Sequence, residues 1–143
     1  MMVYGSKEAI FAHAFLTLTW NLVCPSKSTV LIHRNHISWD HDAICIQFAH
    51  MNTDMAGDDV KHKQHFYANQ LCLPICALTE LAKYLAVFQS KADGMLFDKN
   101  SYQRFGKYLQ KLVAANNVEV KRLGIKIEDI GVHSIRKGAA TYY

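Results

Sequence analysis

The spacing of the apolar residues changes from a helical period to short strand-forming runs and back again, and this change constrains the fold most. Between residues 10 and 22, apolar side chains recur on one face of a predicted helix. Ser6 precedes this segment, and serine is a residue type that caps helices. Pro25 ends this helix because proline cannot continue it. Short runs rich in strand formers follow, at residues 30–32, 37–39, 43–49 and 65–68, with a turn at 40–42.

Helical spacing returns in the second half of the chain. Pro74 opens a predicted helix that runs to about Gln89, with a buried stripe of Ile75, Leu78, Leu81, Ala82 and Leu85. A second helix over residues 100–115 directs Phe105, Leu109, Leu112 and Val113 inward, and a third begins near His133. This order predicts an α+β fold, mainly helical, with a small antiparallel sheet after the first long helix. Residues 1–143 are expected to form one domain.

Composition excludes several classes of protein. Half of the 143 residues are apolar and 20% are charged, which excludes a disordered chain. No uncharged apolar stretch is long enough to span a bilayer, and the first residues lack the order of a secretory signal, so we expect a nuclear or intracellular protein without a membrane partner. In that setting Cys24, Cys45, Cys72 and Cys76 are expected to be free thiols. Trp20 and Trp39 have apolar neighbours, which predicts that both lie in the core.

The charge is unevenly distributed. The whole chain has a net charge of +4, but residues 1–98 carry seven basic and nine acidic groups, whereas residues 99–143 carry nine basic and three acidic groups. A basic final third indicates a polyanionic partner, with nucleic acid the first candidate. A solvated basic face without a partner would have the same composition.

The sharpest local pattern is His133-Ser134-Ile135-Arg136, followed by Lys137. Residues three apart share a helix face, so His133 and Arg136 can converge on one anion. Arginine grips two phosphate oxygens at once, and histidine donates a hydrogen bond or moves a proton. The alternative is a structural pair at the helix start, with Glu128 or Asp129 as the acid.

The segment 133–141, HSIRKGAAT, resembles the His-x-x-Arg box of the tyrosine recombinase (phage-integrase-like) superfamily, most closely the eukaryotic branch found in Crypton-type mobile elements. The resemblance extends over nearly the whole chain, in the same order, through residues 18–24, 36–39, 48–54, 65–69 and 75–76. It implies a mainly helical catalytic-type domain that binds duplex DNA, with possible self-association on DNA, and that acts in DNA recombination and integration. No small-molecule substrate and no cofactor are implied.

In this family a tyrosine attacks a DNA phosphate, two arginines and the histidine stabilise the charged transition state, and a lysine protonates the leaving oxygen. His133 and Arg136 match the box, so the resemblance implies catalytic positions there. Pro25 stands at the position of the first arginine and Asn52 at that of the lysine. Lys27, Arg34 and Lys61 are near these positions but do not match them. The resemblance also implies DNA contacts by Arg136, Lys137, Lys121, Arg122 and Lys126.

The nucleophilic tyrosine of the family lies well beyond the box, whereas this sequence ends seven residues after Arg136. Tyr142 and Tyr143 are too close to the box to match it. We therefore expect a domain whose C-terminal part is missing, either a fragment or a gene product cut short, and no strand transfer by this chain.

Two alternatives come from other classes. His62 and His65, Cys72 and Cys76, and His33 and His36 have spacings tolerable for zinc, which would make the chain a zinc-stabilised interaction module. We predict no metal, because no pair has the tight spacing of a zinc ribbon or finger, and Cys76 falls on an apolar helix face. The other alternative is a basic helical scaffold with no DNA role.

Overall fold

The computed structural model describes residues 6–23, 26–48, 62–89 and 91–142. Its α-helices are α1 (Lys7–Leu22), α2 (Ser26–Val30), α3 (Ala77–Val87), α4 (Ser101–Ala115), α5 (Asn117–Arg122) and α6 (Val132–Tyr142). Its strands are β1 (Ile37–Asp40), β2 (Ala43–Phe48) and β3 (His62–Phe66). Short 3-10 turns lie at Arg34–His36, Leu73–Ile75 and Ile127–Asp129. The fold is α+β and mainly helical, with the sheet after the first long helix, as the sequence predicts.

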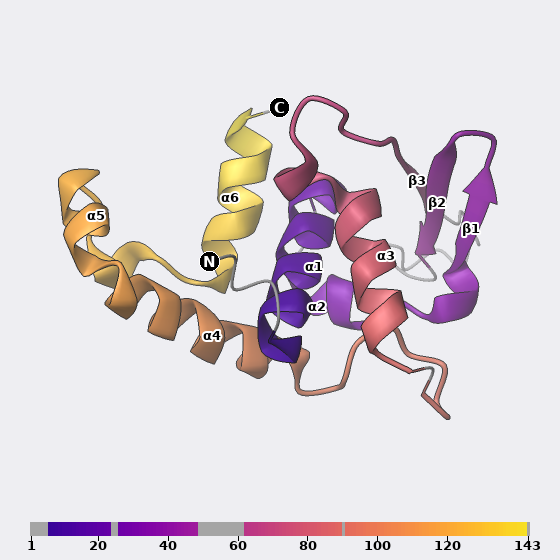
Figure 1. Cartoon of the computed structure of the whole chain (residues 1–143), viewed down its shortest axis with the longest axis horizontal. Coiled ribbons are helices and arrows are strands. Elements are labelled where there is room, and N and C mark those ends of the chain that lie inside the picture. Colours follow the sequence, from indigo (N-terminus) through magenta and orange to yellow (C-terminus); the bar gives the residue numbers. More distant parts are fainter. Residues whose placement is uncertain (1–5, 24–25, 49–61, 90, 143) are drawn as a thin grey trace, which may run out of the picture.

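Helix α1 is the centre of the molecule, with α3 on one side and α6 on the other (Figure 1). The Ser6 side chain accepts a hydrogen bond from the Ala9 N–H, which confirms Ser6 as the cap. The helix ends at Val23, which adopts a left-handed conformation with φ of 48°. Pro25 lies outside the described residues. Because α1 contacts helices on several sides, it is buried nearly all round, at Phe11, Phe15, Thr19 and Leu22 among others.

The three strands form one antiparallel sheet in the order β1-β2-β3. Ile44 and Ile46 of β2 are buried and join the main core. Trp39 of β1 is 71% exposed, so its predicted place in the core is wrong. It lies on a strand at the sheet edge, where no described element covers it, whereas Trp20 is partly buried against the core.

The segment 30–32 is not a strand. Val30 ends α2, and Ile32 is buried while its carbonyl accepts a hydrogen bond from the Leu96 N–H. Its β-branched residues therefore fill the core from a helix end and a turn, because packing overrides the weak strand preference of a short run.

Helix α3 begins later than predicted and presents a different face. Pro74 lies in the preceding 3-10 turn, and Ile75 and Leu85 are exposed by 57% and 39%. The buried residues are Ala77, Glu80, Leu81 and Tyr84. The predicted stripe is thus displaced around the helix, because the side that contacts α1 includes a buried carboxylate that the apolar pattern ignores.

Aromatic rings form the core beneath α1. The Phe15 ring centroid lies 5.3 Å from that of Phe97 and 5.1 Å from that of Phe105 of α4. Such pairs contribute roughly 0.5–1.5 kcal/mol beyond burial. Phe105 and Val113 face inward as predicted, but Leu112 is 48% exposed and Leu109 only partly buried. The second half of α4 therefore extends beyond the core, and α5 stands at its far end (Figure 1).

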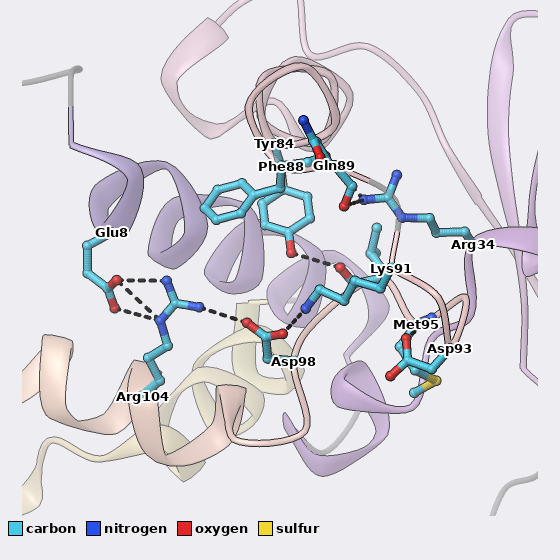
Figure 2. Close-up of polar contacts among 11 residues, drawn as sticks. Glu8, Arg34, Tyr84, Phe88, Gln89, Lys91, Asp93, Met95, Asp98 and Arg104 are labelled. Atoms are coloured by element: carbon cyan, nitrogen blue, oxygen red, sulfur yellow. Dashed lines mark hydrogen bonds and ion pairs between the residues drawn. The ribbon is translucent and has the colours of Figure 1, made fainter.

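Ion pairs fix the segment between α3 and α4 against the start of α1. Arg104 binds Glu8 with its Nη2 2.8 Å from Oε2, and its Nη1 lies 3.2 Å from Asp98 Oδ2. Lys91 pairs with the same Asp98, so Glu8, Arg104, Asp98 and Lys91 form one chain of charges (Figure 2). The Arg104 guanidinium also lies 4.3 Å from the Phe11 ring centroid. These four side chains hold together the start of α1, the start of α4 and the segment between α3 and α4.

Within the described ranges, no helix has the length and apolar character needed to cross a bilayer.

Candidate nucleic-acid interface

His133 and Arg136 lie in the first turns of α6, and both are exposed. The Ser134 hydroxyl fixes the start of this helix: it accepts a hydrogen bond from the Gly131 N–H at 3.0 Å and donates one to the Asp129 carbonyl at 3.1 Å. Among the residues that the structure describes, no ion pair joins His133 or Arg136 to Glu128 or Asp129. The structural pair considered above does not form.

Three helices bring polar side chains together beside His133. The Tyr102 hydroxyl of α4 lies 3.3 Å from His133 Nε2, within hydrogen-bonding distance. The Lys27 ammonium of α2 lies 5.8 Å from the centre of the Tyr102 ring, where a cation is attracted to the ring face. Arg136 is three residues after His133 on α6, so it shares that helix face. Lys27, Tyr102, His133 and Arg136 are hereafter called the three-helix cluster. It combines an ammonium, a guanidinium, a hydroxyl and an imidazole, which are suitable ligands for phosphate oxygens.

A direct contact joins α2 to α6 beneath this cluster. The buried Ser26 hydroxyl donates a 3.4 Å hydrogen bond to the Val132 carbonyl, across a sequence separation of 106 residues. Ser26 follows Pro25, and Val132 precedes His133. The fold therefore places the residue after the predicted first-arginine position next to the start of the His-x-x-Arg box.

Several basic residues are already engaged within the protein. Arg104 and Lys91 belong to the chain of charges described above (Figure 2). The Arg34 guanidinium donates hydrogen bonds to the carbonyls of Phe88 at 3.3 Å and Gln89 at 3.2 Å. These three side chains hold structure together, so they are poorly placed to contact a polyanion.

The residues predicted to bind DNA fall into two groups. Arg136 and Lys137 are exposed on α6. Lys121 and Arg122 are on α5, which stands well apart from α6 at the other end of α4 (Figure 1), and Lys126 lies in the segment that leads away from α5. The spacing of these residues along the chain carries no information on this separation.

Arg122 differs from the other predicted DNA contacts because it has an acidic partner. Its Nε lies 3.0 Å from Glu119 Oε2. The hydrogen bond from Arg122 lowers the pKa of the Glu119 carboxyl and raises the pKa of the Arg122 guanidinium. Part of the Arg122 charge is therefore compensated, although an exposed pair of this kind is easily exchanged for another anion.

The zinc pairs do not converge in the part of the chain that the structure covers. No group of three His, Cys, Asp or Glu side chains is placed there to hold a metal ion. His65 Nε2 is 2.8 Å from Asp40 Oδ2, and the buried Cys76 thiol accepts a hydrogen bond from the Asn69 N–H. Of the four cysteines predicted to be free thiols, Cys45, Cys72 and Cys76 form no disulfide in the described ranges, and Cys24 lies outside them. Whether the fold needs zinc stays a prediction.

Comparison with protein-family models, curated proteins and solved structures finds no match for this chain. Membership of the family that the sequence resembles is therefore a proposal.

Two members of that cluster were not predicted from the sequence. Tyr102 has no motif around it, and Lys27 was set aside because its position does not match the family's. The sequence around either residue does not predict a place near His133, because that place depends on how α2, α4 and α6 pack around α1. Pro25 and Asn52 lie outside the described residues.

Proposed function

We propose that this chain is a duplex-DNA-binding domain of the tyrosine-recombinase type that does not itself cut DNA. The observation that carries the proposal is the convergence of α2 and α6, through the 3.4 Å contact of Ser26 with Val132, at the three-helix cluster. In the family, the first arginine and the His-x-x-Arg box hold the same phosphate, so their positions must be adjacent in space. The Ser26 contact brings the corresponding chain segments together.

The proposed DNA contacts are electrostatic. Lys27, Arg136 and Lys137 are exposed around the cluster, and each can displace counterions from a phosphate. Lys121 on α5, which stands apart from α6 (Figure 1), and Lys126 after it supply a second contact along the backbone. Because phosphate contacts carry no base identity, binding is expected to show little sequence preference. The function inherited from such a family is DNA recombination and integration in the nucleus, reduced here to binding.

The test measures how the affinity for a fluorescent DNA duplex depends on salt, by anisotropy. Lys27→Ala and Arg136→Ala should each lower the slope of log affinity against log salt by about one, since each removes one phosphate contact. Lys107→Ala is the matched control. Lys107 is exposed on α4, about 140° around the helix from Tyr102 at 100° per residue, so its removal should leave the slope unchanged.

Equal effects of Lys27→Ala and Lys107→Ala would mean that only net charge matters, and would contradict a site at the three-helix cluster. Absence of binding at low salt by the folded chain would favour the basic scaffold instead. The same titration tests self-association on DNA, which predicts cooperative binding on longer duplexes and non-cooperative binding on a short one.

A further inference from the structure

A cavity of about 620 Å³ lies among α1, α3 and α4 and shares no residue with the three-helix cluster. Its walls are mainly apolar, formed by side chains that include Ile10, Leu16, Val87, Leu109 and Leu112. A volume of this size is typical of sites that hold a small organic molecule. It also accounts for Leu109 and Leu112, which the sequence predicts to face a core and the structure leaves partly or half exposed.

One polar cluster faces this apolar cavity. The Glu80 side chain is only 2% exposed, and its two oxygens have separate partners: Oε2 is 3.1 Å from His13 Nδ1, and Oε1 is 3.1 Å from Lys83 Nζ. His13 and Lys83 are much more exposed, at 31% and 43%. The carboxylate is thus covered, while the two nitrogen bases reach the surface of the cavity.

This arrangement selects the charge of a ligand. Because the Glu80 carboxylate is buried and each of its oxygens already has a nitrogen partner, an incoming ammonium would meet Lys83 and His13 first. An incoming anion would meet the same bases favourably, because charge-assisted hydrogen bonds to an ammonium or imidazolium are the strong ones. Among the described residues, Tyr108 is the only other titratable side chain on the cavity wall.

We propose that this cavity binds an aliphatic carboxylic acid. The hydrocarbon chain lies among the apolar residues of α1, α3 and α4, and the carboxylate lies beside Lys83 and His13. Glu80 is a positioning residue that holds the two bases at the cavity. This site is independent of DNA binding, because none of its residues belongs to the three-helix cluster.

The test compares three probes that share one hydrocarbon chain and differ in the head group: decanoate, decanol and decylamine. Calorimetric titration of the full chain, below the concentrations at which the probes aggregate, should give the tightest binding for decanoate. Decanol should bind about tenfold more weakly, the usual effect of losing one charge-assisted hydrogen bond, and decylamine more weakly still. Equal affinity for all three, or no decanoate binding, would overturn the proposal.

Two variants locate the site. Lys83→Met keeps the length of the side chain and should lower decanoate affinity about tenfold while leaving decanol affinity unchanged. Ala86→Phe places a ring at the cavity wall and should abolish binding of both probes. Decanoate affinity that is unaltered in a folded Ala86→Phe chain would place binding elsewhere and contradict the assignment. If Lys83→Met does not fold, the comparison of head groups on the unaltered chain still decides the charge preference.

Discussion

The Tyr84 hydroxyl lies in the core and donates a 2.7 Å hydrogen bond to the Leu96 carbonyl, which ties α3 to the segment before α4. Burial, with a smaller contribution from Asp98, raises the pKa of Tyr84 to about 12. An unfolded tyrosine titrates near 10. As the pH rises from about 10 to 12, the unfolded chain therefore releases a proton that the folded chain keeps, and this favours unfolding.

Tyr84→Phe is expected to have two effects. At neutral pH it should lower the free energy of unfolding by about 1–2 kcal/mol, because the Leu96 carbonyl loses its buried donor. Above about pH 10 the difference from the unaltered chain should shrink, because the variant lacks the ionisation that destabilises the fold. Urea unfolding at neutral pH and at about pH 11 measures both effects. A difference that stays constant with pH would contradict the raised pKa of Tyr84.

At the scale of elements, α6 lies close to α1 at a single glycine. A Cβ built on Gly138 would lie 2.9 Å from the Trp20 ring, closer than real Cβ contacts allow. Gly106 in α4 offers the matched comparison, because a Cβ there would be 3.5 Å from a Val132 methyl group, an ordinary contact. Both glycines are in helix interiors, so alanine gains the same helix propensity at each position.

The two substitutions should therefore change stability in opposite directions. Gly106→Ala should raise the free energy of unfolding by up to about 1 kcal/mol. Gly138→Ala should lower it, since overpacking costs about 1–3 kcal/mol and outweighs the gain in propensity. Trp20→Leu should remove the penalty of Gly138→Ala in the double variant. Thermal unfolding of the unaltered chain, the three single variants and the double variant tests this. Equal stabilisation by both alanines would mean that α6 does not approach α1 at Gly138.

At the scale of the whole molecule, the proposed DNA interface requires α2, α4 and α6 together, and catalysis requires more than this interface. The Tyr102 hydroxyl is 3.3 Å from His133 Nε2, and within the described ranges no other tyrosine hydroxyl is hydrogen-bonded to His133 or Arg136. In the proposed family a nucleophile also needs the first arginine and a leaving-group acid, and the resemblance places Pro25 and Asn52 at those two positions.

The chain should therefore form no covalent adduct with a nicked suicide duplex, as judged on a denaturing gel. Restoring one group should not rescue activity, because catalytic groups that act as a unit do not contribute singly. Pro25→Arg and Asn52→Lys are the single restorations to compare. An adduct that disappears with Tyr102→Phe, Tyr142→Phe or Tyr143→Phe would contradict the expected inactivity and identify the nucleophile.

The sequence predicted those features that depend on neighbours in the chain. The Ser6 cap, the β1–β2 hairpin, α4 and the start of α6 all follow from local spacing, turn residues and capping, and the structure confirms them. The α+β class follows from the order of these elements. The apolar pattern of the sequence did not predict which face of α3 is buried, because the pairing of Glu80 with His13 places a charged residue in the interior.

The residues of the two candidate sites are brought together by the packing of the helices, which the sequence did not predict. His133 and Arg136 have a recognisable local pattern, but Tyr102 and Lys27 join them through helices that are far apart in the sequence. The same packing separates α5 from α6 (Figure 1). It therefore places Lys121 and Arg122 apart from Arg136 and Lys137, although all four belong to the basic segment 99–143. Local interactions determine where helices and strands form. A site assembled from several elements depends on long-range packing, and the spacing of residues along the chain does not predict that packing.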